Sequence, residues 1–99
     1  MIVSGRFNIW PTELERTISA MPGARDVVVF GVPDQKGGET PLAEVILEDG
    51  VSLTEDVVIA ECADRLGSYK KPGKVVFRAD PFPRSPVGKI QRKVIREQY

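Results

Sequence analysis

The chain has 99 residues, of which 14 are Lys or Arg and 14 are Asp or Glu, so its formal net charge is zero. That balance argues against a nucleic-acid-binding domain, because such domains usually carry a basic excess. The sequence has no histidine and a single cysteine, Cys62, which excludes histidine-based catalysis, an internal disulfide and a cysteine-rich metal site. Its 41% hydrophobic and 28% charged residues are typical of one soluble globular domain.

The two halves of the chain differ strongly in charge. Residues 1–64 hold 4 basic and 12 acidic side chains, a net charge of −8, whereas residues 65–99 hold 10 basic and 2 acidic ones, a net charge of +8. The second half therefore offers a cationic field to an anionic partner. No apolar run approaches the roughly 20 residues of a membrane span, and the N-terminus does not resemble a signal peptide. Together with the single cysteine, this favours a reducing, cytoplasmic compartment.

The first part of the chain predicts a short hairpin and a helix. Residues 2–10 indicate a short strand, a tight turn and a return. Pro11 suits the first turn of a helix, where its missing N–H costs nothing. Leu14, Ile18 and Met21 then follow the helical period and form one apolar stripe.

The middle of the chain predicts two strands and a second helix. The β-forming run at 27–32 indicates a central strand buried on both faces, and 42–48 indicates its neighbour beyond a polar loop at 33–41. Thr54 is a good helix N-cap. The expected apolar face of that helix consists of Ile59, Cys62, Ala63 and Leu66.

The last third of the chain predicts a strand, an extended segment and a helix. Residues 75–77 indicate the strand, and three prolines keep the following segment extended. We expect the final helix to begin near Lys89, with Ile90 and Val94 facing inward. The sequence thus predicts a single α+β domain over residues 1–99. It is a small two-layer domain, with a short N-terminal β-hairpin and a sheet of about three main strands packed by about three helices.

The segment Pro83–Ile90 carries a Gly-Lys pair that enters a predicted helix. A phosphate-binding P-loop would need glycine at Pro83 and Ser or Thr at Ile90, so that interpretation is rejected. What remains is a lysine ammonium, Lys89, presented next to Gly88 on a proline-stiffened arm. By composition alone, an ordinary solvated surface lysine is the favoured explanation.

Two further segments are candidate ligand sites. Residues 69–74 combine an aromatic ring with three lysines, which suits a phosphorylated ligand with an aromatic base, although an ordinary basic turn is the simpler alternative. Residues 4–8 contain Gly5, which permits close backbone approach to a ligand or simply a hairpin connection. The carboxylates around the 33–41 loop have no partner ligands, so no metal site is predicted.

Taken together, the segments resemble the C-terminal domain of adenylate-forming enzymes, the superfamily of acyl-CoA synthetases, peptide-synthetase adenylation domains and luciferases. The typical family runs are M-I-x-x-G-G-x-N-I-x-P-x-E-[IVL]-E, V-x-G-x-P-D-x-x-x-G-E, [YF]-K-x-P and P-[RK]-[ST]-x-x-G-K-[IVL]. They align, in the right order and over essentially the whole chain, with residues 1–15, 29–39, 69–72 and 83–90. The sequence is therefore identified as resembling this C-terminal lid domain.

The resemblance implies a two-step, AMP-forming acid–thiol ligase. A carboxylate would attack the α-phosphate of ATP, and coenzyme A would then displace AMP from the acyl-adenylate. A large N-terminal domain that binds ATP, its Mg²⁺ and the acid would be the main partner, and the 99 residues alone would be inactive. Two alternatives remain. One is a peptide-synthetase-type adenylation domain with a carrier-protein thiol, and the other is a free-standing non-catalytic binding module of the same fold. Fatty or aromatic acids would be the substrate class.

The resemblance also assigns roles to individual residues. Lys89 corresponds to the adenylation lysine, supported by Gly88, and a protein acetyltransferase acting on Lys89 would remove its charge. Two groups of residues would act in the thioester step. The loop that would replace Lys89 after domain rotation is Gly5, Arg6, Phe7 and Asn8, and the residues expected beside coenzyme A are Tyr69, Lys71 and Lys74.

This sequence departs from the family pattern at two positions. Arg6 stands where glycine is commonest, which could narrow the thiol channel or add a cation for a phosphate. Gly37 stands where tryptophan is common, which predicts a looser loop.

Overall fold

The computed structural model describes residues 2–4, 7–33, 38–67 and 70–99, and only the backbone of residues 3, 4, 7 and 8. The elements of this part of the chain are, in order, β1 (Ile2–Ser4), β2 (Phe7–Ile9), α1 (Pro11–Ser19), β3 (Ala24–Pro33), β4 (Glu39–Leu47), α2 (Glu55–Leu66), β5 (Lys74–Phe77) and α3 (Arg92–Arg96). The predicted α+β domain with an N-terminal hairpin, three main strands and three helices is confirmed.

The strands form two separate sheets. β1 and β2 pair as an antiparallel hairpin. The main sheet has the order β3-β4-β5, in which β3 and β4 are antiparallel and β4 and β5 are parallel. Both β3 and β4 are longer than the apolar runs at 27–32 and 42–48 indicated, because backbone pairing continues to Pro33 and Glu39 beyond the hydrophobic residues.

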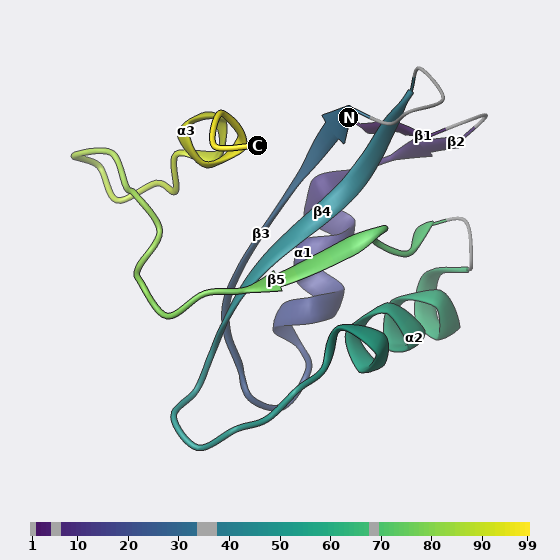
Figure 1. Cartoon of the computed structure of the whole chain (residues 1–99), viewed down its shortest axis with the longest axis horizontal. Coiled ribbons are helices and arrows are strands. Elements are labelled where there is room, and N and C mark those ends of the chain that lie inside the picture. Colours follow the sequence, from purple (N-terminus) through teal and green to yellow (C-terminus); the bar gives the residue numbers. More distant parts are fainter. Residues whose placement is uncertain (1, 5–6, 34–37, 68–69) are drawn as a thin grey trace.

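The main sheet has a helical face and a second face covered by the C-terminal segment (Figure 1). On the helical face, α1, α2 and the β1–β2 hairpin enclose a core to which β3 contributes Val27 and Val29. On the other face, residues 78–99 lie across the sheet, and Phe82 and Ile95 pack against Val28 of β3. Alternate residues of β3 thus serve different cores, which is the period of two expected for a strand. The predicted burial of this strand on both faces is confirmed.

The two long helices follow their sequence signals closely. Pro11 opens α1, and its stripe residues Leu14 and Ile18 are fully buried. In α2, the Oγ1 of Thr54 accepts a hydrogen bond of 3.2 Å from the Val57 N–H, as expected for an N-cap. The buried residues of α2 are Val58 and Cys62, while Ile59 and Leu66 pack at the margin of the core.

The prediction for the last helix is wrong in its start. α3 begins at Arg92, three residues after Lys89, and the fully buried residue is Ile95, while 42% of Val94 is exposed. Ile90 packs against the second core, but it does so from an isolated antiparallel bridge with Arg84. The backbone between Lys89 and the helix is already engaged in this bridge, which delays the first helical turn.

Candidate functional site

Lys89 lies directly after a closed β-turn. We call residues 83–91 the Lys89 hairpin. The Gly88 N–H donates to the Ser85 carbonyl at 2.8 Å, and the Ser85 N–H donates to the Lys89 carbonyl at 2.8 Å. The Gln91 N–H closes the base of the hairpin on the Pro83 carbonyl at 2.8 Å. These bonds hold the backbone on both sides of Lys89.

Gly88 is required for its backbone conformation rather than for space. Its φ is +86°, in the left-handed region that glycine adopts without the steric cost of a Cβ. A Cβ at this position would meet no atom within 4 Å. Gly88 therefore sets the direction of the chain as it enters Lys89.

The Lys89 side chain is exposed to solvent. Among the described residues it takes part in no hydrogen bond or ion pair through its ammonium group. Its neighbour Val87, at the tip of the turn, is 80% exposed. The hairpin thus presents an exposed ammonium group, without a partner among the described residues, next to the exposed apolar side chain of Val87.

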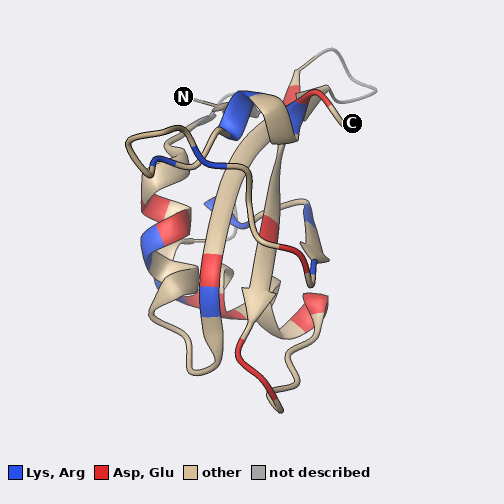
Figure 2. Cartoon of the chain, turned by 90° about the vertical axis from the view of Figure 1, so that its left-hand side faces the viewer, with Lys and Arg blue, Asp and Glu red and all other residues tan. Residues whose placement is uncertain are grey.

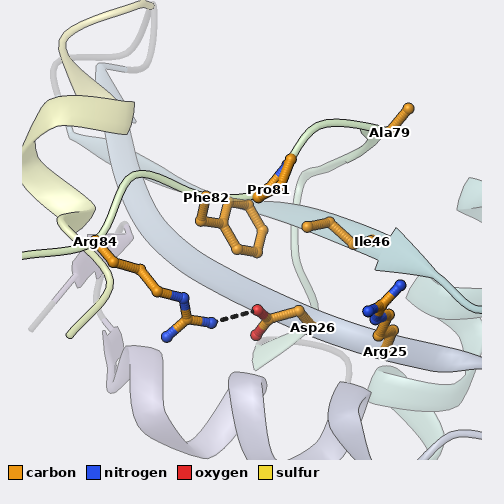
Figure 3. A pocket seen from close by; sticks show the side chains of 7 residues that line it. All are labelled: Arg25, Asp26, Ile46, Ala79, Pro81, Phe82 and Arg84. Atoms are coloured by element: carbon orange, nitrogen blue, oxygen red, sulfur yellow. Dashed lines mark hydrogen bonds and ion pairs between the residues drawn. The ribbon is translucent and has the colours of Figure 1, made fainter. Parts of the chain in front are cut away.

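Arg84 connects the Lys89 hairpin to the main sheet. Its Nη1 donates to the Gly88 carbonyl at 2.9 Å, and its Nη2 lies 2.7 Å from the Oδ2 of Asp26 on β3. Both residues line a hollow of about 340 Å³ between the sheet and the segment that carries Pro81 and Phe82. Figure 3 shows the pair and these neighbouring side chains.

The C-terminal segment is anchored at both of its ends on Glu44, the buried acid of β4. The Oε1 of Glu44 lies 2.7 Å from Nη1 of Arg78, and its Oε2 accepts a hydrogen bond of 2.5 Å from the Tyr99 hydroxyl. The Tyr99 ring packs on Phe30 with a centroid distance of 5.6 Å, and the Arg78 guanidinium lies 5.0 Å from the centroid of the Phe82 ring. Burial, the hydrogen bond to Glu44 and the charge of Glu44 raise the pKa of Tyr99 to about 12, against the opposing charge of Arg78.

The predicted thioester-step loop is described only in part. Gly5 and Arg6 lie outside the described residues. The backbones of Phe7 and Asn8 belong to β2, where they pair with Ser4 and Val3 of β1. The hairpin expected from the sequence is therefore present, with Ser4 as the last residue of its first strand and Phe7 as the first residue of its second.

The second predicted ligand segment is the loop before β5. Tyr69 lies outside the described residues. Lys70 is committed to Glu13 of α1, with Nζ 3.0 Å from Oε1. Lys71 and Lys74, in contrast, are exposed, and neither forms an ion pair with a described residue. Of the three lysines in this segment, the two assigned to coenzyme A are thus the ones left open to solvent.

The described parts of the two predicted groups of site residues belong to segments that pack on different faces of the main sheet. The β1–β2 hairpin packs on the helical face, and the ion pair of Lys70 ties the loop before β5 to α1 on that same side. The Lys89 hairpin belongs to the segment that covers the opposite face (Figure 1).

The charge difference between the two halves is largely neutralised within the fold. Six ion pairs between described residues join a basic side chain of 65–99 to an acid of 1–64. Figure 2 shows acidic residues on the strands beneath the basic C-terminal segment. The basic residues of 65–99 that form no ion pair with a described residue are Lys71, Lys74, Lys89 and Lys93.

Sequence reasoning missed the residues that hold the C-terminal segment in place. Arg84 stands out in the sequence only as part of a motif, and its partner Asp26 lies 58 positions away. Glu44 and Tyr99 are 55 positions apart. The only sequence signal for such pairs is the opposite charge of the two halves, which does not specify partners.

Other chemistries find no support in the described residues. Burial and the neighbouring charge of Glu61 raise the pKa of the Cys62 thiol to about 11, against the effect of Arg65, so it is a poor nucleophile. Among the residues that the structure describes, no group of three or more His, Cys, Asp or Glu could hold a metal ion. The described helices include none that is long and apolar enough to cross a membrane.

Comparison with known proteins identifies the family. Residues 13–89 match the family described as the AMP-binding enzyme C-terminal domain. The whole chain is 43% identical to the long-chain-fatty-acid–CoA ligase FadD13 of Mycobacterium tuberculosis, and covers 19% of that protein. Over 98% of its length it is 39% identical to 4-chlorobenzoate–CoA ligase of Pseudomonas sp. strain CBS-3, of which it covers 18%. The chain thus spans about one fifth of the length of these relatives.

Solved structures agree with the sequence comparison. The chain superimposes with a TM-score of 0.90 on a fatty acyl CoA synthetase of Mycobacterium tuberculosis, at 43% identity over 100% of this chain and 19% of that one. The TM-score is 0.91 for ATP-bound MatB from Rhodopseudomonas palustris, at 38% identity over 99% of this chain and 20% of that one. This chain matches the C-terminal part of acyl-CoA ligases of the adenylate-forming superfamily, and it belongs to the AMP-binding enzyme C-terminal domain family.

Proposed function

We propose that residues 1–99 form the mobile C-terminal domain of an ATP-dependent, AMP-forming acyl-CoA ligase. The observation that carries the proposal is Lys89, a cation that forms no ion pair with a described residue and is held on a hydrogen-bonded hairpin within a stretch that resembles the family's lysine motif. A large N-terminal domain would bind ATP, its Mg²⁺ and the acid. The 99 residues alone would then activate no acid, because the pockets for ATP and the acid lie in that other domain.

In the first half-reaction, Lys89 would stabilise the charge that shifts between the carboxylate and the α-phosphate of ATP. A single preorganised donor of this kind is typically worth about 10²- to 10³-fold in rate. The hairpin supports the proposal because it fixes the backbone of Lys89 while leaving its ammonium group unpaired among the described residues. The lysine acts by its charge and hydrogen bonds, as neither a base nor a nucleophile.

In the second half-reaction, the domain would rotate and present its other face. The β1–β2 hairpin with Gly5, Arg6, Phe7 and Asn8 would then replace Lys89 beside the acyl-adenylate. Ile2 and Ile9 of this hairpin pack in the core on the helical face, while the segment that carries Lys89 covers the other face, which supports two orientations over one. The rotation itself is part of the proposal.

Coenzyme A is the thiol that the available features favour. Lys71 and Lys74 are exposed and unpaired among the described residues, so they can meet the phosphates of its nucleotide end, with Tyr69 beside its base. The relatives named above are CoA ligases, which favours coenzyme A over a carrier-protein thiol. Such an enzyme would work in the cytoplasm, and acetylation of Lys89 would switch off its adenylation step.

The role of Lys89 is tested in the complete enzyme that carries this domain. Lys89→Ala should lower ATP–pyrophosphate exchange by about 10²- to 10³-fold and largely spare thioester formation from preformed acyl-adenylate. Lys93→Ala is the matched control, because Lys93 is also an exposed lysine of the C-terminal segment that is unpaired among the described residues. Equal loss in both half-reactions would contradict the assignment.

The coenzyme A site is tested by the opposite pattern. Lys71→Ala or Tyr69→Ala should raise the KM for coenzyme A and leave ATP–pyrophosphate exchange close to that of the unmodified enzyme. Removal of one exposed charge–phosphate contact should change this KM by about two- to tenfold. An unchanged KM in both variants would remove the loop before β5 from the site.

A further inference from the structure

Arg84 holds the Lys89 hairpin against the main sheet through two different bonds. One nitrogen of its guanidinium donates to the Gly88 carbonyl at 2.9 Å, and the other meets the Asp26 carboxylate on β3 at 2.7 Å (Figure 3). We propose that Arg84 and Asp26 are positioning residues that fix the Lys89 ammonium for the adenylation step. This inference rests on the proposed function of Lys89.

The backbone bonds of the hairpin join its own two strands and Ile90 packs against the second core, so the Arg84–Asp26 pair is what ties the Gly88 end of the hairpin to β3 among the described residues. Its two strands pair through an isolated bridge between Arg84 and Ile90, and a lone two-stranded hairpin is only marginally stable in water. Its tip is exposed, with Val87 at 80%. Arg84 and Asp26 also line the hollow of about 340 Å³, so the pair spans the space between the hairpin and β3.

The bond to the Gly88 carbonyl acts directly on Lys89. That oxygen belongs to the peptide group that joins Gly88 to Lys89, and a peptide group is planar. Fixing its oxygen, together with the Ser85 bond to the Lys89 carbonyl, fixes the peptide groups on both sides of the Lys89 Cα. The side chain then leaves the hairpin in a defined direction.

Arginine is suited to this place and lysine is not. The guanidinium has several N–H donors in a rigid fork, so one side chain can bond a carbonyl and a carboxylate at once. A lysine ammonium at this position would keep the charge but not the fork geometry. Arg84→Lys therefore separates the geometric role from the charge.

The exposure of the pair indicates a role in position rather than in stability. The side chains of Arg84 and Asp26 are 46% and 31% exposed. Ion pairs so open to water contribute little to folding. A misplacement of a catalytic group by about 1 Å, in contrast, can cost about 100-fold in rate.

The experiment uses the complete enzyme with the variants Arg84→Lys, Asp26→Asn and the double variant. Arg65→Lys is the matched control, because Arg65 pairs with Glu61 at similar exposure, 50% and 45%, away from the hairpin. Two quantities are measured: amide hydrogen exchange of the peptide that covers residues 83–91, and the kinetics of each half-reaction. The expected result is faster exchange in this peptide and a kcat for adenylation lowered by about 10- to 100-fold.

The remaining expectations separate positioning from other roles. The KM values for ATP and the acid, and the thioester step from preformed acyl-adenylate, should stay at their unmodified values. The double variant should be no slower than the worse single variant, because Asp26 acts on the hairpin only through its bond to Arg84. The proposal would be overturned if amide hydrogen exchange at 83–91 is unchanged. It would also be overturned if the kcat for adenylation falls in Arg84→Lys but not in Asp26→Asn.

Failure of the proposed function gives a different result. If Lys89→Ala leaves adenylation unchanged, the positioning role falls together with the role of Lys89. Faster amide hydrogen exchange of residues 83–91 in Arg84→Lys and Asp26→Asn would then still show that these residues hold the hairpin. If these two variants show normal amide hydrogen exchange while Lys89→Ala strongly slows adenylation, the positioning role of Arg84 and Asp26 is rejected and the proposed function stands.

Discussion

The anchoring of the C-terminal segment by Glu44 leads to a quantitative prediction. Only 3% of this residue is exposed, and its carboxylate accepts two bonds, from Arg78 at 2.7 Å and from Tyr99 at 2.5 Å. These two partners lie at the start and at the end of the segment that carries the Lys89 hairpin. Glu44→Gln keeps the shape of the side chain and removes its charge.

The size of the effect follows from the two bonds. A hydrogen bond to a charged group is worth about 1.5–3 kcal/mol and a neutral one about 0.5–1.5 kcal/mol, so each bond should lose about 1 kcal/mol. Arg78 keeps its bonds to the carbonyls of Asp80 and Pro81, which limits the cost of its lost partner. We therefore expect Glu44→Gln to lower the free energy of unfolding by about 2 kcal/mol and the Tm by about 10 °C.

Urea unfolding followed by circular dichroism measures this change. The midpoint should fall with little change in the slope, which would indicate lost stability rather than a changed unfolded state. Glu61→Gln is the control, because the exposed pair with Arg65 in α2 should contribute only about 0.3–0.5 kcal/mol. Glu44→Gln with a loss no larger than that of Glu61→Gln would refute the reasoning.

Two further predictions concern the same segment. Gly88→Ala should distort the turn, because a side chain at a φ of +86° costs about 1–2 kcal/mol. We therefore expect slower adenylation in the complete enzyme and an unchanged coenzyme A step. Normal adenylation would show that the turn is not needed. Tyr99 should ionise late in an alkaline titration followed by tyrosinate absorbance, because its pKa rises from 10.0 to about 12. Since the folded-state pKa is the higher one, the stability gained from Tyr99 is fully present below pH 10 and is lost as the pH rises through about 12. Tyr99→Phe should remove that late step, and a Tyr99 midpoint near 10 would contradict the burial of its hydroxyl and its bond to Glu44.

The sequence predicted the elements well where local signals agree. Pro11 before a stripe of Leu14 and Ile18 fixes α1, and Thr54 fixes the start of α2. The continuous apolar run of β3 predicted a strand buried on both faces. The family resemblance rests on short motifs of this local kind, and those motifs alone are enough to single out Lys89.

Local sequence signals did not predict the start of the last helix correctly. Lys89, Ile90 and the residues after them suit a helix by composition, but the hairpin bonds of Ser85 and Pro83 use their backbone groups first. Whether that competition favours a hairpin depends on Phe82 and Ile95, which hold the two ends of the segment on the sheet. Sequence windows of a few residues contain no information about such distant packing.

The opposite charges of the two halves were readable from the sequence, and they suggested an external anion. The tertiary structure instead pairs most of these charges internally, as in Arg84 with Asp26 and Arg78 with Glu44. Only the fold decides this, because a Coulomb interaction depends on distance in space, and these partners are 58 and 34 positions apart along the chain. The sequence by itself determined which lysine to consider, and the tertiary structure decided that its charge stays unpaired among the described residues and which residues hold it in place.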